Sequence, residues 1–102
     1  MADKKNRLTS LERTDYELFV QELKAMGIKA SEWEKLKLTI AKEIANARAS
    51  TVPALSVKDL AETVGVTGSA IRAYESGGRL PILFNLWMIG KATGKRLKIS
   101  YE

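Results

Sequence analysis

VKDLAETVGVTGSAIRAYES, residues 57–76, is the stretch that decides the fold. Apolar residues recur at helical intervals in two short segments, one on each side of Gly65. Ser56 and Thr67 stand directly before these segments, where a helix N-cap is expected. Gly65 can adopt the positive φ that ends one helix and turns the chain. The stretch therefore predicts two short helices joined by a tight turn.

Two helices that meet at a steep angle through a short turn need a small residue at their closest approach, and Ala61 suits that place. A helix-turn-helix is the interpretation we follow, and an ordinary pair of core helices is the alternative. The apolar set that would hold the pair on the rest of the domain consists of Leu60, Val64, Val66, Ile71 and Tyr74.

Upstream of this stretch, the pattern predicts two more helices. The first starts at a capping box, Thr14 to Glu17, and stops near Gly27. The second starts with Ser31 to Glu34 and runs for roughly four to five turns, until the polar segment around Pro53 breaks it. Its apolar stripe is Trp33, Leu36, Ile40, Ile44 and Ala47.

Downstream, a further helix is expected to start with Pro81 at its first position and to run to about Thr93. Residues 96–101 then alternate apolar and polar side chains, as in a half-buried strand. The expected fold is an all-α helix-turn-helix bundle of about five to six helices with a short C-terminal β-strand. Residues 1–31 would be an extension with one short helix, and residues 32–102 the helix-turn-helix domain.

The composition excludes several classes of protein. The chain has 102 residues, 45% of them apolar and 28% charged, which is ordinary for one globular domain. It has no cysteine and no histidine, so disulfides, thiolate and imidazole catalysis and most zinc or haem sites are ruled out. We expect no enzymatic activity, no metal and no cofactor. Because no apolar segment of signal-peptide length follows the basic N-terminus, we expect a cytoplasmic protein.

Positive charge is concentrated late in the chain. The net charge is +5, and the first fifty residues mix both signs almost evenly. We expect a polyanion to be attracted to the C-terminal half, although a solvated basic face would show the same bias. Between Thr67 and Ser100 a single acidic residue, Glu75, stands among Arg72, Arg79, Lys91, Lys95, Arg96 and Lys98.

The motif resembles that of the XRE family, the helix-turn-helix proteins of the Cro and phage-repressor type. The stretch after it is similar to the ending of HigA-like antitoxins. The resemblance covers about the last seventy residues and implies a DNA-binding regulator. It rests on Leu55, Leu60-Ala61, Gly65-Val66-Thr67, Ser69-Ala70-Ile71, Tyr74-Glu75-Ser76-Gly77, Arg79 and Pro81.

A second resemblance points to the MerR family. MerR-type chains open with such a motif and continue into a basic wing and a long coiled coil, whereas 56 residues precede Val57 here and a single helix is expected after the motif. The MerR interpretation is therefore the weaker one. Its residues are Val66-Thr67, Ile71-Arg72, Tyr74-Glu75, Gly78 and Leu80-Pro81.

The resemblance implies that the second helix of the motif enters the DNA major groove. Its outward positions would be Gly68, Ser69, Arg72 and Ala73, a set with small side chains in which only Arg72 can make bidentate bonds to bases. An ion pair with Glu75 is the alternative role of Arg72. The residues expected to contact phosphates are Ser56, Lys58, Thr67 and Arg79, with plain helix capping as the alternative for Ser56 and Thr67.

We expect a homodimer on a palindromic operator. Residues 82–92 are apolar nearly all round, so a second chain or the intramolecular core has to cover them. The predicted strand offers an edge that could pair with its copy. The residues expected at this dimer interface are Phe84, Trp87, Met88, Leu97, Ile99 and Tyr101.

Two functions from different classes remain open at the level of sequence. The first is an autoregulatory transcriptional repressor, and the resemblance to HigA-like proteins implies the antitoxin of a toxin-antitoxin pair as its specific form. The second is an interaction protein that neutralises a toxin and binds DNA weakly. In either case residues 1–31 would bind a partner or only extend the core.

Overall fold

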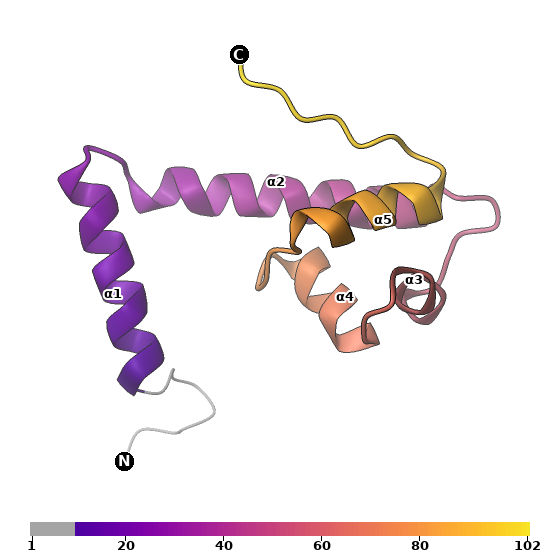
Figure 1. Cartoon of the computed structure of the whole chain (residues 1–102), viewed down its shortest axis with the longest axis horizontal. Helices are drawn as coiled ribbons and strands as arrows, with labels where there is room; N and C mark the ends of the chain where they lie inside the picture. Colours follow the sequence, from indigo (N-terminus) through magenta and orange to yellow (C-terminus); the bar gives the residue numbers. More distant parts are fainter. Residues whose placement is uncertain (1–9) are drawn as a thin grey trace. The chain divides into compact units, whose positions relative to one another are not determined.

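The computed structural model describes residues 10–102, with side chains from Tyr16 onward. The chain divides into two compact units, residues 1–35 and 36–102, with the boundary inside the second helix. The described part is all α, without strands, and contains five helices (Figure 1): α1 (Ser10–Ala25), α2 (Ala30–Ala49), α3 (Val57–Val64), α4 (Gly68–Ser76) and α5 (Leu83–Thr93).

In the first unit, a tight turn joins α1 to the start of α2. Gly27 has a φ of 77°, and the Ile28 amide donates a hydrogen bond of 2.8 Å to the Leu23 carbonyl across the turn. The rings of Phe19 and Trp33 meet edge to face, with centroids 6.0 Å apart. Other large apolar side chains of this unit remain exposed: Tyr16, Leu18, Met26 and Ile28.

The second unit has a small core to which α2, α3, α4 and α5 all contribute. Its largest fully buried side chains are Ile44, Leu60 and Ile71, one each from α2, α3 and α4. α3 packs against both α4 and α5, so it connects the second helix of the motif to the last helix. The other buried members of the core cluster are Ala61, Val64, Ala70, Tyr74 and Ile89.

The prediction of a C-terminal strand is wrong for the single chain. Residues 95–102 form no strand, and Figure 1 shows them as an irregular segment after α5. An alternating pattern yields a strand only where a neighbour accepts its backbone hydrogen bonds. No segment of residues 10–102 supplies such a neighbour.

Two expected helix starts also differ from those in the structure. α1 begins at Ser10 rather than at Thr14. α5 begins at Leu83 rather than at Pro81, because Ile82 is still extended, with φ −66° and ψ 158°, and forms the N-cap. No helix within residues 10–102 is long and apolar enough to cross a membrane.

Candidate nucleic-acid interface

Residues 57–76 form the predicted pair of helices, joined by a three-residue turn. The hydroxyl of Ser56 accepts a hydrogen bond of 3.0 Å from the Asp59 amide at the start of α3. Gly65 ends α3 in the left-handed region with φ 87°, and its amide donates to the Ala61 carbonyl. The hydroxyl of Thr67 accepts a bond from the Ala70 amide at 3.1 Å and caps α4. Both predicted N-caps and the predicted turn glycine are confirmed.

The apolar face of the motif is buried as expected. Ala61, the small residue predicted at the closest approach of the two helices, is 4% exposed. Four of the five predicted apolar side chains of the motif lie in the core cluster, and Val66 is half-buried against it. The opposite face of α4 is therefore the one left for a ligand.

The outward face of α4 carries small side chains and one long one. Ser69 and Arg72 are exposed, while Gly68 and Ala73 are half-buried. A Cβ added at Gly68 would lie 3.8 Å from Nη1 of Arg72. The Arg72 guanidinium thus lies over the first turn of α4, the part of a recognition helix that comes nearest to base edges.

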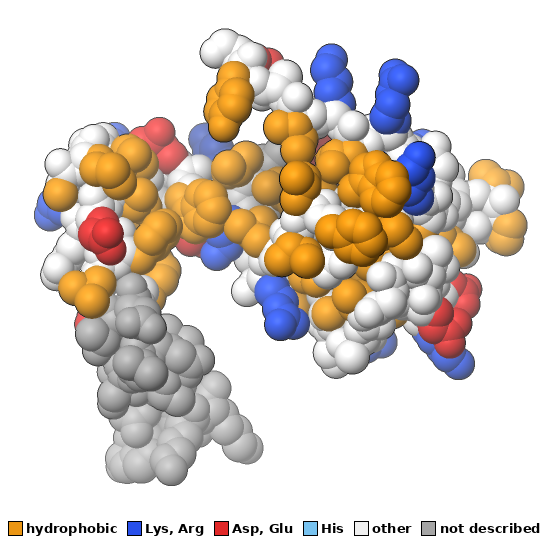
Figure 2. Space-filling view, in the orientation of Figure 1, with side chains coloured by type: hydrophobic (Ala, Val, Ile, Leu, Met, Phe, Trp, Pro, Cys, Tyr) orange, Lys and Arg blue, Asp and Glu red, His pale blue; other side chains and the backbone are white. Residues whose placement is uncertain are grey.

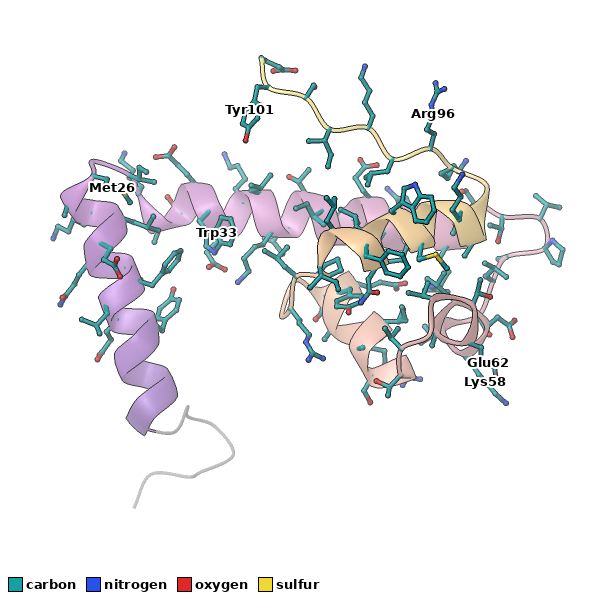
Figure 3. All side chains as sticks on the ribbon, in the orientation of Figure 1. Met26, Trp33, Lys58, Glu62, Arg96 and Tyr101 are labelled. Atoms are coloured by element: carbon teal, nitrogen blue, oxygen red, sulfur yellow. The ribbon has the colours of Figure 1, made fainter. Side chains whose placement is uncertain are left out.

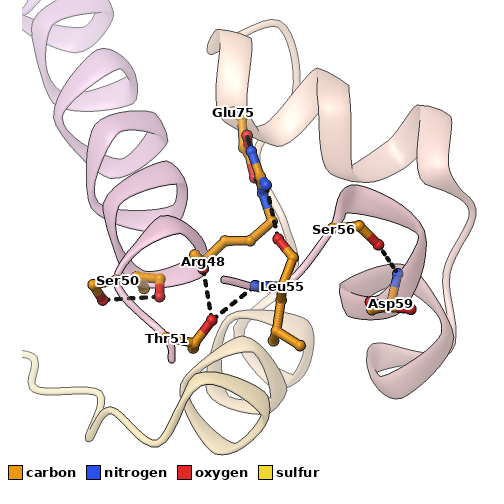
Figure 4. A network of polar contacts seen from close by, with 8 residues as sticks. Arg48, Ser50, Thr51, Leu55, Ser56, Asp59 and Glu75 are labelled. Carbon is orange, nitrogen blue, oxygen red and sulfur yellow. Dashed lines mark hydrogen bonds and ion pairs between the residues drawn. The ribbon is translucent and has the colours of Figure 1, made fainter. Parts of the chain in front are cut away.

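A partly buried ion pair connects α2 to α4 (Figure 4). Arg48 donates from Nε to Oε2 of Glu75 at 2.6 Å and from Nη2 to Oε1 at 2.9 Å. The side chains of Arg48 and Glu75 are only 23% and 14% exposed. The hydrogen bond to Glu75 raises the pKa of Arg48 above its ordinary value, against the effect of desolvation. Both carboxylate oxygens of Glu75 accept hydrogen bonds from Arg48. The structure therefore does not support the alternative in which Glu75 pairs with Arg72.

The same arginine also holds the loop before α3. Its Nη1 donates a hydrogen bond of 2.9 Å to the Leu55 carbonyl. The hydroxyl of Thr51 accepts a bond of 2.8 Å from the Leu55 amide and lies 3.0 Å from the Arg48 carbonyl oxygen. Arg48 therefore connects α2, α4 and the residues that lead into the Ser56 cap.

Sequence reasoning missed Arg48, although the pattern carried a signal. Arg48 follows Ile44 by four residues, and Glu75 follows Ile71 by four, so each charged residue continues a buried stripe of its helix. A charged side chain on such a stripe needs a partner of opposite sign. The pairing itself spans 27 positions along the chain, and no local rule predicts it.

Positive and negative charges are balanced within the motif, although the C-terminal half of the chain as a whole has an excess of basic residues. Residues 57–79 contain three basic side chains, Lys58, Arg72 and Arg79, and three acidic ones, Asp59, Glu62 and Glu75. The basic excess lies instead at the end of α5 and after it. Figure 3 shows Arg96 of that segment and Lys58 of α3 pointing to opposite sides of the second unit.

The expected phosphate contacts all lie at the surface, and two of them already serve as helix caps. Ser56, Lys58, Thr67 and Arg79 are exposed. Ser56 and Thr67 cap α3 and α4 through their hydroxyl oxygens, which is the alternative role given to them. Their hydroxyls would contact a phosphate only in addition to the cap.

The expected dimer residues fall into two groups. Phe84, Trp87, Ile99 and Tyr101 are exposed, and Figure 2 shows apolar side chains gathered over α5 and the segment after it. Met88 and Leu97, in contrast, are half-buried, and Met88 packs against the core of its own chain. An apolar groove in this region is lined by Leu83, Phe84, Trp87, Leu97 and Ile99.

No group of three or more histidine, cysteine or carboxylate side chains that could hold a metal ion occurs among residues 10–102. Comparison of the chain with known protein families, with curated proteins and with solved structures found no match.

Proposed function

We propose that the chain is a sequence-specific DNA-binding transcriptional repressor that acts as a homodimer on a palindromic operator and regulates its own gene. The observation that carries the proposal is the capped pair α3 and α4, whose second helix turns a face of small residues with one arginine toward solvent. The resemblance of residues 57–76 to XRE-type motifs supports the same function.

The small residues suit a helix that enters a groove closely. Gly68 and Ala73 would allow the backbone of α4 to approach the base edges, and the methyl group of Ala73 can contact a thymine methyl. Such a face forms few hydrogen bonds to bases. Specificity would therefore come from Arg72 and from the shape of the DNA.

Two further cations, one near each end of the motif, would position the protein on the DNA backbone. Lys58 lies in the first turn of α3 and Arg79 follows the end of α4. The charge balance of residues 57–79 makes each of these cations important, because Asp59 and Glu62 oppose the attraction of phosphates. We expect modest non-specific affinity and a salt dependence that corresponds to few phosphate contacts.

Selection from a random duplex pool tests the proposal. The purified chain should enrich an inverted repeat whose half-sites are about 10 base pairs apart, the spacing that two recognition helices on one DNA face require. A variant with Arg72→Ala, which removes the one side chain of α4 able to form bidentate bonds to bases, should enrich this repeat more weakly. Recovery of a pool without sequence preference by the unmodified chain would argue against the repressor.

A second function is favoured by the first unit. Tyr16 and Leu18 of α1 are 47% and 51% exposed, and Met26 after it is 65% exposed, which is typical of a surface that binds protein. The chain would then neutralise a toxin, with DNA binding secondary. Growth arrest by the product of an adjacent gene should be relieved by the chain and by Arg72→Ala, but not by Met26→Glu. Relief by Met26→Glu would exclude this surface.

A further inference from the structure

Along the segment after α5, the apolar side chains become more exposed toward the C-terminus. Leu97 is half-buried, Ile99 is 65% exposed and Tyr101 is fully exposed. Leu97 and Ile99 line the groove with Leu83, Phe84 and Trp87. The same side of the segment thus faces α5 at its beginning and solvent at Tyr101.

We propose that residues 96–102 pair antiparallel with the same residues of a second copy, in a register centred on Ile99. This pairing gives the interface of the homodimer named in the proposed function, and it rests on the proposal that the chain is a homodimer. In this register the Tyr101 side chain of each copy lies beside Leu97 of the other and extends the other copy's apolar groove.

The sequence fits this register on both faces of the paired segment. On one face Leu97 lies opposite Tyr101 of the second copy, and Ile99 lies opposite itself. On the other face Arg96 lies opposite Glu102 of the second copy. Opposite charges stabilise cross-strand pairs, and the two-fold symmetry produces the Arg96–Glu102 pair twice.

Neighbouring registers fit less well. A register centred on Lys98 places two lysines directly opposite each other, which is destabilising. A register centred between two residues places apolar side chains opposite charged ones. A register centred on Ser100 keeps a Lys98–Glu102 pair, but leaves Arg96 and Leu97 without a partner among residues 96–102.

The exposed area matches what a stable dimer needs. The side chains of Ile82, Leu83 and Phe84 are 66%, 62% and 59% exposed, and those of Trp87, Ile99 and Tyr101 are 45%, 65% and 103% exposed. Three of the six are aromatic, and an aromatic side chain buries roughly 150 to 250 Å² when it is fully covered. The six partly exposed residues therefore offer several hundred Å² per copy, of the order of the roughly 800 Å² per partner in a standard interface.

Gly90 fixes the point at which the segment leaves α5. The Lys95 amide donates a hydrogen bond of 2.9 Å to the Gly90 carbonyl. A Cβ at Gly90 would come within 2.8 Å of the Lys95 carbonyl oxygen. The segment therefore starts against α5 at a distance that only glycine permits, and this places Leu97 over the groove.

Cysteine crosslinking tests the register, because the natural chain has no cysteine. In the proposed register two Ile99→Cys residues have Cα atoms about 4.5 to 5.5 Å apart, within the range of a disulfide. Mild oxidation in DNA-free buffer should convert Ile99→Cys to a covalent dimer. The matched control Ser100→Cys should remain largely unlinked. Efficient linkage through Cys at position 100 and not at position 99 would overturn the register.

Charge exchange provides a second test that does not depend on a disulfide. Arg96→Glu and Glu102→Arg should each raise the dimer Kd about fivefold or more, and the double variant should restore it. Lys98→Glu, opposite Ser100, should change the Kd less than about twofold. A natural chain that sediments as a monomer, or a double variant that dimerises no better than the single variants, would overturn the proposal.

The two proposals can fail separately. Specific DNA binding without crosslinking at position 99 would contradict this dimer alone. Crosslinking at position 99 without any DNA sequence preference would contradict only the repressor.

Discussion

The guanidinium of Arg48 in α2 donates two hydrogen bonds to the carboxylate of Glu75 in α4, at 2.6 and 2.9 Å. Glu75 lies three residues after Arg72, the one long side chain on the outward face of α4. The ion pair therefore fixes the orientation of the helix that we propose enters the groove. Because both side chains are largely shielded from water, the loss of one would leave the other without compensation.

Glu75→Gln should lower the free energy of unfolding by about 1 to 3 kcal/mol, since the partly buried Arg48 loses its counter-charge. Urea denaturation of the two proteins measures this. Glu62→Gln removes the same charge from an exposed position of α3 and is the control, with an expected change within about 0.5 kcal/mol. Equal effects of the two substitutions would show that the pair contributes nothing specific.

Replacing Arg48 and Glu75 singly and together measures the coupling energy between the two side chains. Arg48→Met with Glu75→Leu should be less destabilising than the sum of the two single changes, because two apolar side chains leave no buried charge. The double-mutant cycle is read from the same denaturation curves. Strict additivity would contradict direct coupling of the two side chains.

Thr67→Ala should cost about 1 kcal/mol of stability, because the Ala70 amide loses its hydrogen-bond acceptor at the start of α4. Thr67→Ser retains the oxygen and should behave as the natural chain. Thermal unfolding followed by circular dichroism distinguishes the two. If alanine and serine were equivalent, the hydroxyl would not be acting as a cap.

Gly90→Ala should destabilise the second unit by about 1 kcal/mol, although alanine is normally the better helix residue. Its Cβ would meet the Lys95 backbone oxygen at 2.8 Å, and the cost of such overpacking, about 1 to 3 kcal/mol, exceeds the gain of about 1 kcal/mol in helix propensity. Gly78→Ala is the control, because the nearest atom to its Cβ, the Ser76 oxygen, is 3.5 Å away. If urea denaturation showed that Gly90→Ala is stabilised, the segment after α5 would be able to move away from the added Cβ at little cost.

Local signals in the sequence predicted the local structure well. Ser56, Gly65 and Thr67 act within a few residues of their own positions, so their side chains or backbone freedom determine the caps and the turn directly. The buried stripe of α3 and α4 followed from helical periodicity. These features place the candidate interface on α4.

The features that sequence reasoning missed depend on distant parts of the chain or on a second chain. Arg48 and Glu75 meet only because the fold brings α2 and α4 together. The alternation at residues 96–101 indicates a strand, but a strand needs a partner that residues 10–102 of one chain do not supply. The late basic residues suggested a positively charged motif, but four of the six, Lys91, Lys95, Arg96 and Lys98, lie at the end of α5 or after it.

Arg79→Ala should weaken binding to all DNA sequences alike and flatten the dependence of log K on log salt by about one unit, because one phosphate contact is lost. Fluorescence anisotropy over a series of salt concentrations measures the slope. Lys42→Ala is the control, since Lys42 is an exposed residue of α2 outside the motif. An unchanged slope for Arg79→Ala would remove this residue from the interface.

Arg72→Ala tests the reading of bases. It should reduce the preference for the target over a scrambled duplex by about 1 to 3 kcal/mol, because Arg72 is the one side chain on α4 able to form bidentate bonds to a base. Ser69→Ala, on the same face, should have a smaller effect. A target-to-scrambled ratio unaltered by Arg72→Ala would contradict direct readout by this residue.

The most direct test of the central claim is the affinity of the natural chain for DNA upstream of its own gene, compared with a scrambled duplex of equal length and composition at several salt concentrations. A sequence-specific repressor should prefer the upstream DNA by about a thousandfold or more near physiological salt. Equal affinity for the two duplexes, falling steeply with salt for both, would contradict the claim that α4 reads sequence.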